Sequence, residues 1–304
     1  MHLVTVDGTM SSSLVMSYSL PPIRTSPSGS SEIRTFEKLL KNIYQGNKIL
    51  LRDAERLRGH LHRIYLLRSL AGYAYILKCA PSRDARILRH EKKSLETEGR
   101  VLDLIHASCQ IPIPQNISND SSNRNVVHSP YILQSYIPGR LLSSVEQHLS
   151  APEREDIDRT LGGFIRSISS IRNNTFGPVH RVYAGSGHST WREAFLSMLE
   201  SVLRDCEDLL VSLPYDSIRY YTSTQAHALN GIQEAQLVPL DAGTAQNVLL
   251  DEQTRQISGL LGFSHVVWGD PLLAWCFKDA STAFWEGYGT RVGYDESERT
   301  RQML

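Results

Sequence analysis

The chain has 304 residues, of which 41% are hydrophobic, so it can bury one large core or two smaller ones, and we expect two lobes. Its 32 Lys and Arg residues balance 32 Asp and Glu residues, so the formal net charge is zero. A neutral chain has no long-range attraction to nucleic acid or to an anionic membrane. The composition therefore predicts a small-molecule or protein partner, of which we favour a small-molecule substrate, with no nucleic acid and no membrane.

Cysteine usage and the N-terminal region bear on the compartment. The four cysteines are scattered without a CxxC or other metal-binding spacing, which is typical of reduced thiols. No apolar run is long enough to span a bilayer. The N-terminal region has Asp7 and no Lys or Arg before Arg24, and serines interrupt its apolar stretch, which is unlike a signal peptide. These features predict a cytoplasmic location.

The first part of the chain has a polar beginning and then a regular pattern. Residues 1–31 are rich in Ser and are predicted to form a flexible arm with little capacity to fold alone. Apolar residues then recur at spacings of three and four from Ile33 to Ile43, which predicts an amphipathic helix. Residues 49–80 alternate and carry β-branched and aromatic side chains. They are predicted to form two or three antiparallel strands, with Lys78 near the end of the last one.

A helix and another strand are predicted to complete this lobe. Apolar residues at helical spacing predict a helix over residues 83–108. A proline-containing extended stretch and a polar loop over residues 119–125 follow. Residues 131–136 have the composition of a strand. Residues 32–139 are therefore predicted to form an N-lobe, a small antiparallel sheet with one long helix.

The rest of the chain has a mainly helical pattern. Residues 161–168 and residues 191–210 each place apolar side chains on one helical face. Two short apolar runs, 248–250 and 257–261, flank a polar turn, which predicts a buried β-hairpin. We therefore expect a helical C-lobe over residues 140–294. The charged residues 295–304 are predicted to form a frayed tail.

Several short motifs occur in an order that resembles the aminoglycoside phosphotransferase and choline-kinase-like family, especially its fungal members. They are Tyr75-Ile76-Leu77-Lys78, His90-Glu91 with Glu98, Ile111-Pro112-Ile113-Pro114, residues 131–139, residues 241–251, Trp268-Gly269-Asp270-Pro271 and residues 284–289. The resemblance implies an α+β, bilobal protein-kinase-like fold. Its N-lobe would be a small antiparallel sheet plus one helix, and its larger C-lobe would be mainly helical with a catalytic-loop hairpin.

The resemblance also implies roles for residues of the first lobe. Lys78 would hold nucleotide phosphates and pair with Glu98, although a strand-end lysine and a solvated glutamate remain the alternative. The loop over residues 57–63 has one glycine where a backbone phosphate cradle needs more.

Side chains replace that cradle in the predicted binding set. His60, His62 and Arg63 could contact anions from this loop, and a solvated basic turn is the alternative reading. Gln134 and Tyr136 belong to the same set as substrate-binding or nucleotide-binding residues. The second lobe adds Asn247, which opens the first strand of the hairpin, and Ser264, which follows the second strand.

The catalytic motif departs from the family pattern. The family's His-Gly-Asp signature reads Pro239-Leu240-Asp241 in this chain, and Asn247 follows Asp241 by six residues where the family has five. A gapless alignment would place Ala242 at the position of the base. We favour a one-residue insertion in the loop, because a loop absorbs an extra residue at little cost. Asp241 is then the predicted base, with a cap or turn role as the alternative.

The family's metal-binding Asp is replaced by Gly262. Magnesium at a nucleotide is held by one or two carboxylates together with the phosphates, so this change removes most of the protein's share. A loss of about 4 kcal/mol of transition-state stabilisation corresponds to roughly a thousandfold in rate. Asn247 is a weak candidate ligand, and we predict no metal site. ATP and magnesium are cofactors only if the protein is a phosphotransferase.

Three functions follow from this sequence. The preferred prediction is a small-molecule-binding enzyme of specialised metabolism that performs metal-independent acid/base chemistry, such as isomerisation, elimination or cyclisation, in the cleft between the lobes. Its predicted catalytic residues are Asp241, Lys78, Glu98 and His265, with Asp241 or His265 as general base and Lys78 or a tyrosine as acid. The alternatives are an ATP- and magnesium-dependent small-molecule phosphotransferase and a non-catalytic pseudokinase.

Overall fold

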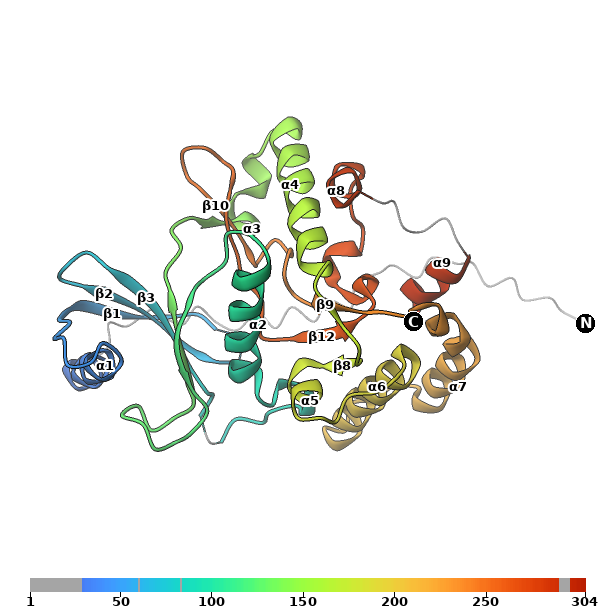
Figure 1. The fold of residues 1–304 in the computed structure, drawn as a ribbon, viewed down its shortest axis with the longest axis horizontal. Helices are drawn as coiled ribbons and strands as arrows, with labels where there is room; N and C mark the ends of the chain where they lie inside the picture. Colours follow the sequence, from blue (N-terminus) through green and yellow to red (C-terminus); the bar gives the residue numbers. More distant parts are fainter. Residues whose placement is uncertain (1–28, 60, 83, 290–295) are drawn as a thin grey trace, which may run out of the picture.

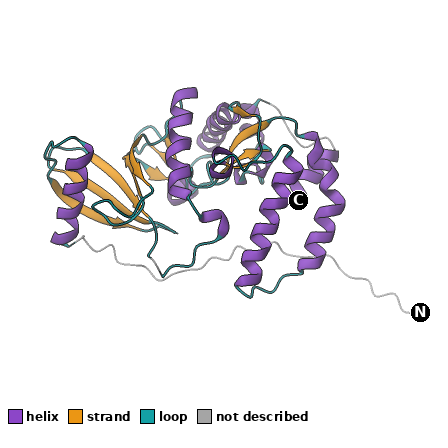
Figure 2. Cartoon of the chain, turned by 60° about the horizontal axis from the view of Figure 1, so that its bottom comes forward, coloured by secondary structure: helices purple, strands orange, loops and turns teal. Residues whose placement is uncertain are grey.

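The computed structural model of this chain describes residues 29–59, 61–82, 84–289 and 296–304. The described chain has two lobes, a sheet-rich lobe and a larger, mainly helical lobe (Figure 1). Figure 2 shows the largest sheet at one end of the molecule and most of the helices toward the other end. Most of the predicted flexible arm, residues 1–28, lies outside the described residues.

The first lobe is built on a five-stranded antiparallel sheet in the order β1-β2-β3-β5-β4. Its strands are β1 (Leu51–Leu57), β2 (Arg63–Ser69), β3 (Ala74–Cys79), β4 (Asn116–Asp120) and β5 (Tyr131–Ser135). Two helices accompany it, α1 (Ser30–Ile43) and α2 (Ser94–Ser108).

Alternation along the strands divides the apolar side chains between the two faces of this sheet. Leu133 joins the core under α1, which contributes Phe36 and Leu40. The next residue along the strand, Ile132, joins the larger core that includes Leu102 of α2 and extends into the second lobe. Because successive strand residues point to opposite faces, one strand serves both cores.

The helix predicted over residues 83–108 begins only at Ser94. Arg89–Glu91 form a short 3₁₀ turn, and Lys93 has a left-handed φ of 61°. The backbone N–H of Arg89 donates to Asp205 Oδ2 of the second lobe at 2.8 Å. A tertiary contact therefore satisfies a donor that a longer helix would have used, and the helix starts later than its periodicity suggests.

A second difference concerns the loop predicted over residues 119–125. Its first residues belong to strand β4, in which Ser118 pairs with Leu133 and Asn119 pairs with Ile132. The sequence Asn-Ile-Ser-Asn-Asp has one apolar residue, so its composition gave no sign of a strand. An edge strand can be this polar because it has a strand neighbour on one side only.

The second lobe combines short sheets with helices. Its helices are α3 (Leu142–Val145), α4 (Ala151–Ser169), α5 (Val179–Tyr183), α6 (Trp191–Asp208), α7 (Tyr215–Gln225), α8 (Thr282–Tyr288) and α9 (Glu296–Met303). One sheet has the order β11-β10-β6 and the other β7-β9-β12-β8. These strands are β6 (Arg140–Leu141), β7 (Arg172–Asn173), β8 (Gly177–Pro178), β9 (Ala235–Pro239), β10 (Val248–Leu250), β11 (Ile257–Leu260) and β12 (Val266–Gly269).

The predicted hairpin is confirmed as β10 and β11, which pair antiparallel. The frayed tail predicted over residues 295–304 is wrong, because Glu296–Met303 form α9. Arg301 of this helix donates from Nε to Asp270 Oδ2 at 2.8 Å, and both side chains are nearly buried. A charged sequence folded here because one of its charges finds a buried partner in the second lobe.

Helices α4 and α8 approach each other closely enough to require glycine. A Cβ atom at Gly287 would collide with the carbonyl oxygen of Arg159, and one at Gly162 would collide with that of Phe284. The two helices therefore pack backbone against backbone, beside the sheet that carries the candidate site (Figure 1). No helix in the described ranges combines the length and the apolarity needed to cross a bilayer.

Candidate functional site

The pairing of β9 with β12 brings Asp241 and His265 together. In this antiparallel register Pro239 lies opposite Val266, and Leu240 N–H donates to the carbonyl of His265 at 2.9 Å. Asp241 follows directly, and its Oδ2 lies 2.8 Å from Nδ1 of His265. The two residues are separated by 24 positions in the sequence, so sheet register rather than local sequence creates the pair.

The hydrogen bond to Asp241 is the main cause of a raised pKa at His265, and it outweighs the opposing effect of burial. Nε2 of His265 is shielded from solvent and has no hydrogen-bond partner among the described residues. The ring of His90, on the 3₁₀ turn, lies edge-on to that of His265 with centroids 5.5 Å apart. Burial lowers the pKa of His90, and the neighbouring His265 lowers it further. His265 is therefore the more basic of the two imidazoles.

The predicted pair of Lys78 with Glu98 is confirmed. Lys78 Nζ on β3 lies 2.5 Å from Glu98 Oε1 on α2, where the carboxylate side chain is only 2% exposed. Ser264 Oγ donates to the other oxygen, Glu98 Oε2, at 2.9 Å, and the buried Gln134 side chain faces the same carboxylate. Burial alone would raise the pKa of Glu98, but the charge of Lys78 and these polar contacts hold it below its usual value.

The two pairs are linked through consecutive residues. Ser264 contacts Glu98 of the first lobe, and His265 contacts Asp241 of the second lobe. The dipeptide Ser264-His265 thus connects a buried ion pair to a carboxylate–imidazole pair. This arrangement places a cation, two carboxylates and an imidazole at the boundary between the lobes.

His62 comes from the glycine-poor loop and lies in the same region. Its Nε2 is 2.9 Å from Ser94 Oγ at the start of α2. Burial lowers the pKa of His62 to about 4, and Glu98, Lys78 and His265 all lie near enough to act on it. The His62 ring is therefore neutral at physiological pH. A neutral, half-buried ring in this loop does not supply the positive charge that a phosphate cradle needs.

The residues at the family's metal position do not fit magnesium. Gly262 has φ +90°, and a Cβ atom there would lie 2.8 Å from Nδ2 of Asn247. The NH2 group of Asn247 donates to the carbonyl of Asp241 at 3.0 Å and to Thr244 Oγ1 at 3.1 Å, so Oδ1 is the atom of this side chain that could contact a cation. The described residues contain no group of three or more His, Cys, Asp and Glu side chains that could hold a metal ion. Gly262 therefore leaves the Asn247 oxygen without the family's carboxylate beside it, which is a weak donor set for magnesium.

The contacts of Asn247 also bear on the proposed insertion. Its amide reaches back six residues to the backbone of Asp241, and Ala242 is fully buried in the core. The Asp241 carboxylate is partly exposed and faces His265. Of the two candidates for the base position, Asp241 is the one whose side chain lies in the site.

Two of the predicted binding residues within the described ranges, Arg63 and Tyr136, are not brought to this site. Arg63 donates from Nε to the carbonyl of Ala80 at 3.0 Å and lines a separate pocket beside α1. Its position in β2 turns it to the other side of the sheet. Tyr136 is 39% exposed beyond the end of β5, and its side chain points to solvent rather than joining the contacts among Lys78, Glu98 and Ser264. His60 lies outside the described residues.

His90 was not among the predicted site residues. It stood in the sequence as part of a family motif, and its role beside His265 depends on the 3₁₀ turn that replaces the expected start of the helix. No periodicity in residues 83–93 indicated this turn. Its place in the His90-Glu91 motif was the one feature of the sequence that could have indicated a role for His90 in the site.

The fold and these residues define a bilobal protein with the architecture of a kinase-like phosphotransferase. Its structure is similar to that of a thermostable mutant of aminoglycoside phosphotransferase APH(4)-Ia, with a TM-score of 0.54 and 19% identity over 78% of this chain and 73% of that one. It is also similar to macrolide 2'-phosphotransferase MphH from Brachybacterium faecium, with a TM-score of 0.54 and 15% identity over 88% of each chain. These similarities confirm the predicted fold.

The chain belongs to the phosphotransferase enzyme family, whose model matches residues 53–301. It is 30% identical over 142 residues to the Candida tropicalis protein named "Altered inheritance of mitochondria protein 9, mitochondrial". The corresponding Candida albicans protein is 24% identical over 142 residues. The matching segment covers 44% of this chain and 22% of each relative. Because these relatives are named as mitochondrial, the predicted cytoplasmic location is wrong.

Proposed function

We propose that this member of the phosphotransferase family performs metal-independent acid/base chemistry on a small organic molecule between its lobes. The observation that supports this most directly is the 2.8 Å contact between His265 Nδ1 and Asp241 Oδ2. A carboxylate on Nδ1 fixes the tautomer in which Nε2 is the free, basic nitrogen. It also stabilises the imidazolium that forms when Nε2 takes a proton.

His265 is the general base in this proposal, and Asp241 is its positioning residue. Nε2 would remove a proton from a carbon or hydroxyl of the substrate, once the ligand displaces the side chains that now cover this nitrogen. Lys78, which is paired with Glu98, would stabilise the negative charge that develops on the substrate. The proton returns to a neighbouring atom in an isomerisation, or to a leaving group in an elimination.

The phosphotransferase alternative is supported by one ion pair and opposed by the glycine at the metal position. The intact pair of Lys78 with Glu98 is the part of a nucleotide site that the chain retains. The glycine at position 262 argues against the metal that phosphoryl transfer needs, because it replaces the family's metal-binding carboxylate. We therefore place ATP- and magnesium-dependent transfer second, and a non-catalytic pseudokinase third.

The test is an untargeted comparison of metabolites. The full chain is incubated with a small-molecule extract, with EDTA in one arm and with ATP and magnesium in another, and the products are followed by mass spectrometry. We expect one metabolite to be converted to an isomer or a dehydrated product, equally with and without EDTA. Conversion should be lost in His265→Gln and reduced in Asp241→Asn.

His227→Gln is a matched control, because His227 is an exposed histidine of the second lobe. This variant should convert the metabolite like the natural chain. Phosphorylated products that need ATP and magnesium would establish the phosphotransferase alternative. The absence of any turnover in every arm, or turnover that His265→Gln leaves unchanged, would contradict the proposed chemistry.

A further inference from the structure

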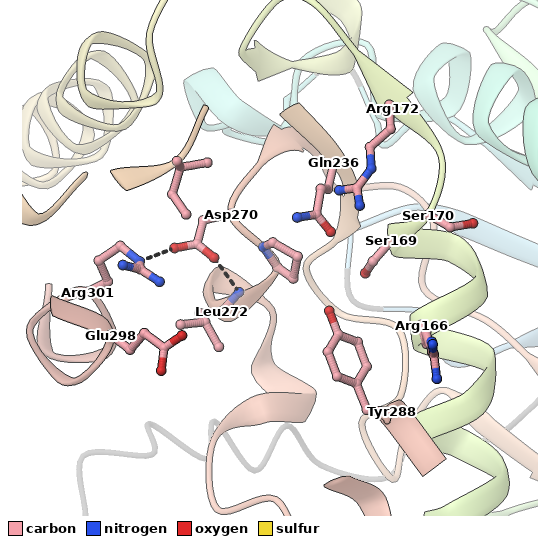
Figure 3. A pocket seen from close by; sticks show the side chains of 12 residues that line it. Arg166, Ser169, Ser170, Arg172, Gln236, Asp270, Leu272, Tyr288, Glu298 and Arg301 are labelled. Atoms are coloured by element: carbon pink, nitrogen blue, oxygen red, sulfur yellow. Dashed lines mark hydrogen bonds and ion pairs between the residues drawn. The ribbon is translucent and has the colours of Figure 1, made fainter. Parts of the chain in front are cut away.

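A second pocket lies in the helical lobe, away from Asp241 and His265. It is formed where the end of α4 meets β7, β9, α8 and α9, and it has a volume of about 480 Å³ (Figure 3). None of the acid/base residues described above lines it. The pocket therefore needs an explanation of its own.

One wall of the pocket contains an ion pair whose two charges satisfy each other. Asp270 and Arg301 form a nearly buried ion pair, and Asp270 Oδ1 also accepts from the backbone N–H of Leu272 at 3.1 Å. Figure 3 shows this pair on the α9 side, with Glu298 next to it. Because the Asp270 carboxylate and the Arg301 guanidinium satisfy each other and Glu298 adds a further carboxylate, this wall offers no positive charge to a ligand.

The opposite wall carries positive charge. Arg166 from the last turns of α4 has no ion pair with any described residue. Arg172 on β7 lies 3.7 Å from Glu234 Oε2, and both side chains are well exposed, so that contact is weak. Figure 3 shows the Arg172 guanidinium beside the Gln236 amide. Two guanidinium groups and an amide thus face the pocket without a strong carboxylate partner.

Neutral groups complete this wall. The buried side chains of Ser169 and Tyr288 lie between the two arginines, with the Tyr288 hydroxyl directed toward Ser169 (Figure 3). Pro271, Leu272 and Ile232 give the pocket an apolar part. A site with a few convergent polar donors and an apolar floor suits an organic ligand with one charged end.

We propose that this pocket binds a small organic anion. Its oxyanion group, a carboxylate or a phosphate, is held by Arg166 and Arg172 with Gln236 as an additional donor. Its apolar body lies on Pro271 and Leu272. Guanidinium groups match the planar or tetrahedral oxygens of such anions better than a lysine would, and neither arginine has to give up a buried partner to bind.

The position of the pocket gives it a direct structural connection to the candidate site. Strand β12 runs from His265, at the acid/base site, to Asp270, at the wall of the pocket. All four residues of this strand are buried, which holds the two ends in a fixed relation. The binding proposal does not depend on the proposed acid/base chemistry, and it can hold or fail by itself.

The test is isothermal titration calorimetry of the full chain with simple probes. Phenyl phosphate and phenylacetate each carry an oxyanion on an apolar body, whereas benzyl alcohol is neutral and inorganic phosphate has no apolar body. We expect at least one of the two organic anions to bind, more tightly than inorganic phosphate, and benzyl alcohol not to bind. Tighter binding of one organic anion identifies whether the pocket prefers phosphate or carboxylate.

Variants locate the site. Arg166→Gln combined with Arg172→Gln should weaken binding about tenfold or more, because each lost charge-assisted hydrogen bond contributes to affinity. Arg34→Gln removes the same charge from an exposed position of α1 in the other lobe and should leave binding unchanged. The proposal is overturned if neither organic anion binds, if the double variant binds like the natural chain while its thermal unfolding is unchanged, or if Arg34→Gln weakens binding equally.

Discussion

Restoring the family's metal-binding residue with Gly262→Asp is expected to destabilise the protein without creating a metal site. Gly262 has φ +90°, a left-handed conformation that costs a residue with a side chain about 1–2 kcal/mol. The new Cβ atom would also lie 2.8 Å from Asn247 Nδ2 and 3.1 Å from the backbone carbon of Asp241. Crowding of this kind costs a further ~1–3 kcal/mol.

The sum predicts a loss of about 2–5 kcal/mol in the free energy of unfolding, measured by urea denaturation at pH 7. Two alanine variants separate its parts. Gly262→Ala introduces the same Cβ atom without the carboxylate, so it should lose nearly as much. Gly72→Ala is the matched control, because Gly72 has φ +89° with nothing within 4 Å of the Cβ position. It should lose only the backbone part.

Calorimetry with magnesium and ATP completes this experiment, and we expect no gain in binding for Gly262→Asp. The reasoning would be refuted if Gly262→Asp were as stable as the natural chain, or if Gly262→Ala and Gly72→Ala lost equal stability. Strong magnesium-dependent ATP binding by Gly262→Asp would also refute it. That result would mean that Asn247 moves aside readily and that one substitution alone removed the metal site.

Two other predictions concern the charges of the site. Lys78→Met leaves the buried Glu98 carboxylate without its cation and should lower the free energy of unfolding, measured by urea denaturation, by about 3–5 kcal/mol. Adding Glu98→Leu to this variant should recover most of that loss. Equal stability of the single and the double variant would contradict the prediction. Burial lowers the pKa of His62 in the folded chain to about 4, so below pH 6.5 the unfolded chain takes up the proton first. The free energy of unfolding should therefore decline as pH falls from 6.5 toward 4, by up to about 3 kcal/mol. His62→Gln should flatten this decline in urea midpoints measured across that range, while a substitution at the exposed His148 should not, and equal slopes in all three chains would count against the assignment.

The sequence by itself determined the architecture and the first ion pair. The strand that ends at Lys78 and the helix that bears Glu98 both follow from local patterns, and the order of motifs was enough to predict that they meet. The hairpin of β10 and β11 was equally visible, because apolar runs around a polar turn form such a pair with few alternatives. Patterns within a short window of sequence carried these predictions.

Only the tertiary structure decided how the second lobe completes the site. The register of β9 against β12 sets His265 beside Asp241, and a slip of one residue would turn both side chains to other faces. The link from Arg89 to Asp205 accompanies a helix that starts later than expected, and the 3₁₀ turn before it places His90 next to His265. The direction of Arg63 and the crowding around Gly262 likewise depend on neighbours far away in the sequence. Local periodicity contains no information about such contacts, because they form only when separate elements pack together.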